Sequence, residues 1–265
     1  MAKLLLAPPL VIGASLAARR WGPGLAGILV ALPLVAGPIL LIADAEHGVR
    51  FAARAASASL LGLAALAAFV VVVAKLSRSR GWMLALAAGW LVYLAVALAL
   101  STVTPAPAIG LALAAGAFGL AGLLTHGGAG LTGVIDVDWP KWDIPARATA
   151  TAVLVLLVTG LSAALGPALT GVLAPFPVAT SVVAGFTLAR HGSNHVVELL
   201  RGFLRGALGF AVFCFLLAVL LVPTGAPAAF AIGLLGAVCL QLLAQLARSR
   251  RRDHDASLAR RIHTV

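Results

Sequence analysis

The chain has 265 residues, of which 62% are apolar and only 10% are charged. A soluble domain carries about 25% charged residues, so this composition excludes an ordinary water-soluble globule and indicates a membrane protein. The formal net charge of +11 is gathered at a few joints and in the C-terminal tail, and we expect no nucleic-acid partner.

Apolar stretches follow one another along the whole chain with short joints between them. A hydrocarbon core of about 30 Å needs about 20 apolar residues per helix, which makes each stretch a candidate membrane span. In chain order they cover residues 4–18, 24–43, 55–74, 82–101, 106–124, 148–165, 168–189, 203–222 and 227–247. The sequence therefore predicts an all-α polytopic membrane protein with nine transmembrane helices.

The sequence also contains an internal repeat, in which the second copy is offset from the first by 144 residues. No gap is needed between residues 22 and 73 of the first copy. The clearest matches are Gly22-Pro23 with Gly166-Pro167, Gly27 with Gly171, Pro33 with Pro177, His47-Gly48 with His191-Gly192, and Gly62 with Gly206. Duplicated membrane units are common in small transporters, which hold their substrate site at the repeat interface.

Charge placement indicates how the two copies face. With nine spans, 16 Lys and Arg residues fall on the side of the C-terminal tail and 3 on the other side. Cytoplasmic loops carry this excess, so we expect the tail inside and the N-terminus outside. The alternative is eight spans, in which 106–124 does not cross and the division is 14 against 5. With nine spans, five helices precede the second copy, so the copies enter the membrane in opposite directions.

These features give four segments. Residues 1–104 form the first repeat of four helices, and 105–146 form an adaptor helix with an interfacial loop. Residues 147–247 form the second, inverted repeat of four helices. Residues 248–265 are a basic cytoplasmic tail, which we expect to lie along anionic lipid headgroups.

A proline interrupts the same helix in each copy. Pro33 and Pro177 each lack a backbone N–H and so release a carbonyl one turn earlier. Lipid cannot satisfy such a group, so each break must face protein or a watery cavity. Gly37 in the first copy and Thr180 and Ser181 in the second lie close to the breaks. A break in both halves points to a substrate site between them, although a purely structural kink is the alternative.

A polar cluster follows each interrupted helix. His47 and His191 occupy equivalent positions, and His191, His195 and Glu198 fall on one helical face, with Arg201 placed to pair with Glu198. These groups either extend to the membrane surface or handle a substrate or proton; the two histidines would then gate opposite mouths of a pathway. The first copy does not repeat the His-xxx-His-xx-Glu pattern, so we expect no metal and no cofactor.

The stretch Gly171-Val-Leu-Ala-Pro-Phe-Pro177, followed by His191-Gly192 and then by Arg201 and Gly206, resembles the GlpM family of small bacterial inner-membrane proteins. The likeness covers about residues 166–210 and, more weakly, 22–66. It implies a fused pair of four-helix units, where smaller relatives would dimerise in antiparallel fashion. It also implies a link to envelope polysaccharide or glycerol metabolism.

We therefore expect a small secondary transporter or flippase of the bacterial inner membrane. It would move a small metabolite or a lipid-linked envelope precursor by alternating access at the repeat interface. The alternative is a non-catalytic accessory subunit of an envelope polysaccharide or lipid assembly. An intramembrane enzyme is a third reading, because only the second copy gathers acid–base groups. Assembly into a homodimer is one alternative for the oligomeric state.

Overall fold

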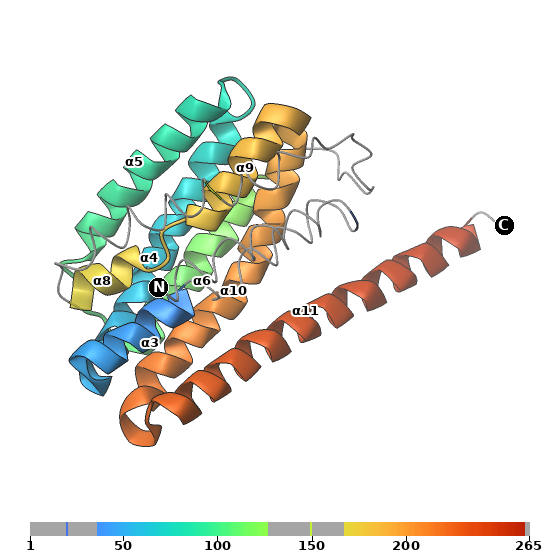
Figure 1. Cartoon of the computed structure of the whole chain (residues 1–265). Helices are drawn as coiled ribbons and strands as arrows, with labels where there is room; N and C mark the ends of the chain where they lie inside the picture. Colours follow the sequence, from blue (N-terminus) through green and yellow to red (C-terminus); the bar gives the residue numbers. More distant parts are fainter. Residues whose placement is uncertain (1–19, 21–35, 127–148, 150–166, 263–265) are drawn as a thin grey trace.

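The computed structural model describes residues 20, 36–126, 149 and 167–262, and the secondary structure within these ranges is helical. Figure 1 shows the helices, whose labels keep the gaps left by the other segments. They are α3 (Ala36–His47), α4 (Val49–Leu76), α5 (Trp82–Leu100), α6 (Pro107–Leu124), α8 (Pro167–Leu173), α9 (Val178–His191), α10 (Ser193–Thr224) and α11 (Ala226–Ile262).

Six segments in the described part of the chain are long and apolar enough to cross a membrane. They are Val49–Leu76, Trp82–Leu100, Pro107–Leu124, Ala168–His191, Ser193–Thr224 and Ala226–Leu246. Each corresponds to one of the nine predicted spans, so those six helices are confirmed. The predicted spans 4–18 and 148–165, most of 24–43 with Pro33, and the adaptor loop after residue 126 lie outside the described residues.

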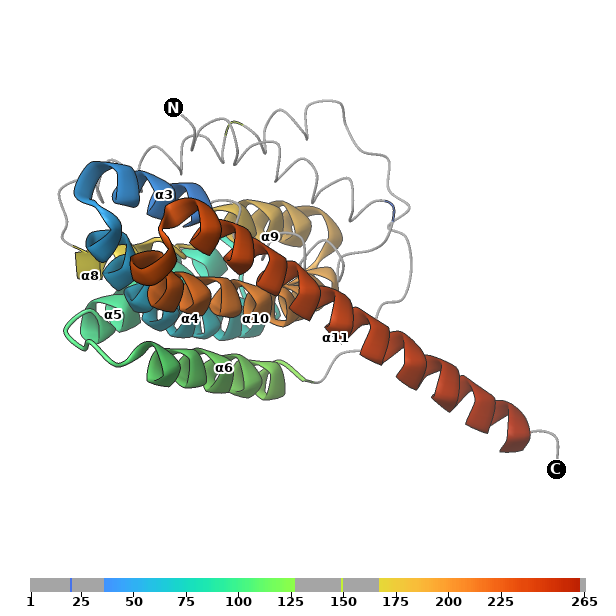
Figure 2. The ribbon, with the colours of Figure 1, turned by 90° about the horizontal axis from the view of Figure 1, so that it is seen from below.

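Helices α4 and α10 form the centre of the bundle. Each contacts the other and α6, while α4 also contacts α3, α5 and α8, and α10 also contacts α9 and α11. Seen from below, α6 lies on one side of this central pair, and α3 and α9 lie on the other (Figure 2). The core is built from leucines and phenylalanines of the central pair, including Leu60, Leu66, Phe69, Phe213 and Leu217. The outer helices α5, α6 and α11 leave most of their apolar surface exposed, as expected of helices that face lipid.

Small residues let the backbones approach closely, which is how helices associate where lipid removes the hydrophobic driving force. A Cβ atom on Gly62 of α4 would overlap the carbonyl oxygen of Val172 in α8, and one on Gly171 would overlap the carbonyl oxygen of Ala55. On the other side of the bundle, a Cβ on Gly209 would lie 3.1 Å from the carbonyl oxygen of Ala237 in α11. Gly62, Gly171 and Gly209 therefore lie at close helix–helix contacts.

The helices alternate in direction between two ends of the bundle. One end, here called the tail end, holds the α4–α5 loop, the end of α6 and the α9–α10 joint. Helix α11 starts at the opposite end and slants away from the bundle toward Ile262 (Figure 1). The other end, here called the far end, holds the α3–α4 joint, the α5–α6 loop and the α10–α11 joint. Central helices α4 and α10 consequently run in opposite directions.

Candidate functional site

The span Ala168–His191 is interrupted by a short non-helical segment, and the predicted break at Pro177 is therefore observed. The seven-residue α8 ends at Leu173, and the fourteen-residue α9 begins after Pro177. Two prolines cause the interruption, because Pro175 and Pro177 both lack the N–H that a continuous helix would need. The N–H of Phe176, which in a continuous helix would bond to Val172, instead donates to the carbonyl of Leu173 at 2.9 Å. The carbonyls of Gly171 and Val172 thus lose their usual helical donors.

Hydroxyl groups from two other helices donate to these two carbonyls. The Ser59 hydroxyl of α4 lies 2.9 Å from the carbonyl oxygen of Gly171 and 2.9 Å from that of Ala55 in its own helix, and its one proton is shared between these two acceptors. The Gly171 carbonyl also accepts from the Ala174 N–H at 3.2 Å. The Tyr93 hydroxyl of α5 donates to the carbonyl oxygen of Val172 at 2.7 Å. Both side chains are completely buried. The break therefore faces protein, as the bilayer requires, and its polar backbone groups lie against α4 and α5.

Aromatic rings surround the break on the α5 side. The Phe176 ring meets the Tyr93 ring edge-on, with centroids 5.2 Å apart, and lies 6.2 Å from the Trp90 ring. The Trp90 Nε1–H donates to the Ser181 hydroxyl of α9 at 2.8 Å. Thr180 is also buried beside this contact. The structure thus brings together Ser181, Thr180 and Pro177 from the predicted site and adds Ser59, Trp90 and Tyr93.

Two hollows adjoin the break. An apolar groove of about 270 Å³ runs between α5 and α9, lined by Trp82, Leu86, Trp90, Ser181, Val182, Gly185, Phe186 and Ala189. A more polar cavity of about 500 Å³ opens at the far end and reaches Val172, lined also by Arg54, Ser57, Ala58, Ser101, Val103, Thr104, Pro105 and Ala168. Neither hollow contains a predicted histidine, so the break and the histidines are separate features.

His47 and His191 lie at opposite ends of the bundle, the first at the far end and the second at the tail end. Each precedes a glycine with a positive φ angle, 86° at Gly48 and 81° at Gly192, and each glycine is followed by a central helix. His47 is exposed and stacks on Phe51 with ring centroids 4.4 Å apart. Gly37, predicted to line the first-copy break, lies in α3 with the Phe213 ring 3.7 Å from where its Cβ would be.

The predicted polar face at the start of α10 is present. His195 Nδ1 lies 2.8 Å from the carbonyl oxygen of His191, and the two imidazole rings are 5.8 Å apart. Glu198 and Arg201 form the predicted ion pair, with 3.8 Å between Oε2 and Nη1. Within the part of the chain that the structure describes, no three His, Cys, Asp or Glu side chains gather as a metal site would require.

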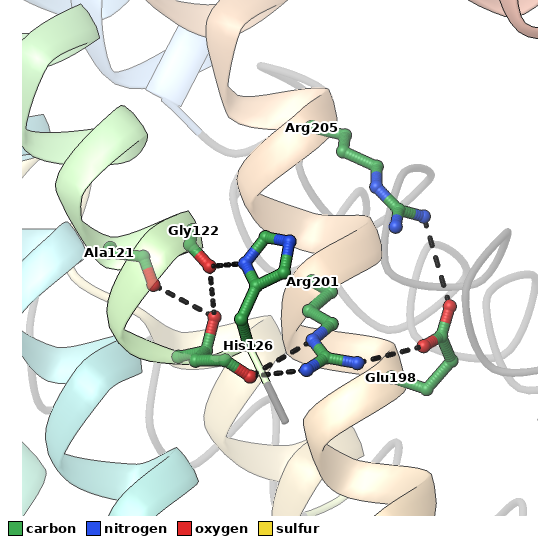
Figure 3. A network of polar contacts seen from close by, with 7 residues as sticks. Ala121, Gly122, His126, Glu198, Arg201 and Arg205 are labelled. Atoms are coloured by element: carbon green, nitrogen blue, oxygen red, sulfur yellow. Dashed lines mark hydrogen bonds and ion pairs between the residues drawn. The ribbon is translucent and has the colours of Figure 1, made fainter. Parts of the chain in front are cut away.

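Arg201 has a second role that its spacing did not predict. Its Nε–H donates to the backbone carbonyl of Thr125 at 3.1 Å, and its Nη2 donates to the same oxygen (Figure 3). Thr125 follows the last residue of α6, where carbonyl groups lack intrahelical donors. Arg201 therefore caps α6, while Arg205 contacts the other oxygen of Glu198 at 3.8 Å. This network joins α6 and α10 at the tail end.

Sequence reasoning missed Tyr93 and Ser59, although one signal was available. Tyr93 is the only tyrosine of the chain and lies in the middle of an otherwise apolar helix. A buried tyrosine hydroxyl nearly always has a hydrogen-bond partner, so this residue marks a buried acceptor nearby. No known protein family, curated protein or solved structure was found to match this chain.

Proposed function

We propose that this chain is a small secondary transporter or flippase built from two inverted repeats, with its substrate site at the breaks in the repeated helix. The equivalent helices support the repeat because their ends match at the offset of 144 residues. α3 and α9 end at His47 and His191, α4 and α10 begin at Val49 and Ser193, and α5 and α11 begin at Trp82 and Ala226.

Packing between helices supports the same repeat. Within the α4–α5 pair, a Cβ on Gly89 would meet the Phe69 ring at 2.8 Å. In the α10–α11 pair, at the equivalent positions, a Cβ on Gly233 would meet the Phe213 ring at 3.0 Å. The opposed directions of α4 and α10 fit a two-fold axis in the membrane plane. Such an axis also accounts for the reciprocal contacts of α5 with α9 and of α11 with α3.

The single observation that carries the proposal is the interrupted helix α8–α9 inside a membrane span. Its carbonyls accept hydrogen bonds from the hydroxyl groups of Ser59 and Tyr93, which come from other helices. When those helices move, the two hydroxyl groups can exchange positions, or a substrate can replace them. Discontinuous helices at a repeat interface are the common site of substrate binding in secondary transporters. In this proposal the structure is a closed state, because both carbonyls are satisfied by protein.

The charge distribution supports an orientation in the bacterial inner membrane with the tail end in the cytoplasm. At the tail end, Lys75 lies in the last turn of α4 and Arg78 and Arg80 lie in the α4–α5 loop. Helix α11 continues into the basic sequence after residue 247. The far end would then face outward. In this orientation His47 lies at the outer mouth of the pathway and His191 at the inner mouth. We also propose that each half corresponds to one GlpM-like unit, so that the chain is a fused pair of such units.

Alternating access can be tested without knowing the substrate. In a background with Cys214→Ala and Cys239→Ala, we expect Ser181→Cys to react with a membrane-impermeant maleimide from either side of sealed, dye-retaining proteoliposomes. Ser79→Cys, an exposed position in the α4–α5 loop, is the control and should react from one side only. Replacing both Pro175 and Pro177 by alanine should make the helix continuous and abolish the two-sided reaction of Ser181→Cys.

Reaction of Ser181→Cys from only one side would contradict alternating access. If the histidines gate the two mouths, His47→Ala should change the pH dependence of labelling from outside, and His191→Ala that from inside. Unchanged pH profiles in both variants would leave the histidines without a gating role.

A second candidate, an accessory subunit, is favoured by the apolar groove between α5 and α9. Trp82 is 44% exposed at its rim, and the groove has room for side chains of a partner helix. For this candidate, Ser181→Cys should react from neither side, and a bulky Ala189→Leu variant, at an exposed position of the groove, should release a partner without altering the fold.

A further inference from the structure

A second groove lies between α6 and α10 at the tail end, away from the break. Its volume is about 340 Å³. Its walls are Ala115, Phe118, Gly119, Gly122, Leu123, His126, Arg201, Leu204, Arg205 and Leu208. Gly119 has only open space where a Cβ would be, which leaves the groove free along α6. Leu123 and Leu208 are 70% and 40% exposed, so the groove opens toward the lipid.

Helix lengths fix the depth of its charged groups in the membrane. The 18 residues of α6 extend about 27 Å, which is close to the thickness of the hydrocarbon core. The end of α6 at Thr125 therefore lies near the membrane surface, and Arg201 lies level with it because it binds the Thr125 carbonyl. Arg205 lies one turn further along α10, toward the hydrocarbon. A cation at that depth requires an anionic partner.

Within the described ranges, Glu198 is the acidic residue that pairs with these arginines, and it balances only part of their charge. It carries one negative charge, whereas Arg201 and Arg205 carry two positive charges, and both ion-pair distances are long at 3.8 Å. The Arg205 side chain is 43% exposed. His126 lies on the opposite wall of the groove, with Nδ1 2.5 Å from the Gly122 carbonyl oxygen (Figure 3). Among the residues that the structure describes, the mouth thus has an excess of positive charge above an apolar floor.

We propose that this groove binds an anionic phospholipid. Its phosphate lies between Arg205 and His126, with Arg201 holding the wall in place, and an acyl chain follows the channel beside Gly119 and Leu208. Charge complementarity at the mouth and lipid-facing leucines along the floor select a molecule with both an anionic head and an apolar chain. The site is independent of the proposed transport, because it shares no residue with the break.

Binding can be measured by native mass spectrometry of the full chain in detergent with added dioleoyl-phosphatidylglycerol or dioleoyl-phosphatidylcholine. We expect one tightly bound phosphatidylglycerol and weaker phosphatidylcholine binding. Arg205→Ala should weaken phosphatidylglycerol binding about fivefold, the effect of roughly one interfacial cation, and Arg205→Lys should restore most of it. Arg54→Ala removes an exposed arginine at the far end and should leave binding unchanged.

A second pair of variants tests the chain channel. Gly119→Leu should fill the groove and prevent tight binding, whereas Gly116→Leu, at an equally open position of α6 outside the groove, should not. Glycerol 3-phosphate, which has the anionic head without chains, should not compete at lipid concentrations that saturate the site. Equal binding of both lipids, or equal effects of Arg205→Ala and Arg54→Ala, would overturn the proposal. Competition by glycerol 3-phosphate would assign the site to a free phosphate ester instead.

Discussion

The Tyr93 hydroxyl is the most direct test of how the broken helix is stabilised. In the Tyr93→Phe variant the ring keeps its edge-on contact with Phe176, but the carbonyl of Val172 loses its donor. That carbonyl is buried, and the Phe176 N–H that would replace the hydroxyl is already bonded to Leu173. Leaving a buried acceptor unsatisfied costs about 1–3 kcal/mol, and hydrogen bonds between membrane helices measure about 0.6–2 kcal/mol. We therefore expect a loss of about 1–2 kcal/mol in the free energy of unfolding.

The assay is equilibrium unfolding in mixed micelles of a mild detergent and sodium dodecyl sulfate, followed by tryptophan fluorescence. The matched control is Ser101→Ala, which removes an exposed hydroxyl at the C-cap of α5 that bonds to the Leu98 carbonyl one turn earlier, at 2.7 Å. The control should change stability by less than about 0.5 kcal/mol. If Tyr93→Phe is as stable as the control, the reasoning about the released carbonyls is wrong.

Three further predictions concern the backbone. Gly62→Ala should lower stability by more than about 2 kcal/mol in the same assay, because its Cβ overlaps the Val172 backbone, whereas Gly116→Ala, which faces open space, should be neutral or slightly stabilising. Gly48→Ala and Gly192→Ala should each cost about 1–2 kcal/mol, because both glycines have positive φ; a large effect at one position and none at the other would argue against their equivalence. Pro177→Ala alone should leave the amide exchange rates around the break unchanged, because Pro175 still lacks its N–H. A changed exchange rate at Val178, whose N–H donates to the Phe176 carbonyl at 2.7 Å in this structure, would contradict this.

Hydropathy predicted the helices well but shortened two of them. The spans expected at 55–74 and 203–222 are α4 over Val49–Leu76 and α10 over Ser193–Thr224. The first turns of both helices carry charged residues, among them Arg50, Arg54 and Glu198, which reduce the local hydropathy without interrupting the helix. Those turns have one apolar face, which packs into the core through residues such as Ala52 and Val196.

The break was predictable and its partners were not. Proline chemistry is local, so Pro177 indicates an interruption from the sequence alone. The donors that satisfy the break are set by how α4, α5 and α8 pack, and Ser59 and Gly171 are 112 residues apart in the chain. The same limit applied to Arg201, whose ion pair with Glu198 is local and was predicted, whereas its bond to Thr125 spans 76 residues and was not.

The opposed orientation of the two halves is the claim on which the proposed mechanism depends most directly. Ser79 in the α4–α5 loop and Thr224 at the end of α10 are exposed and lie at opposite ends of the bundle. Ser79→Cys and Thr224→Cys should be compared in bacterial cells, in a background with both native cysteines replaced by alanine. A membrane-impermeant maleimide should label Thr224→Cys in intact cells and Ser79→Cys only after lysis. Labelling of both positions from the same side would contradict the inverted repeat.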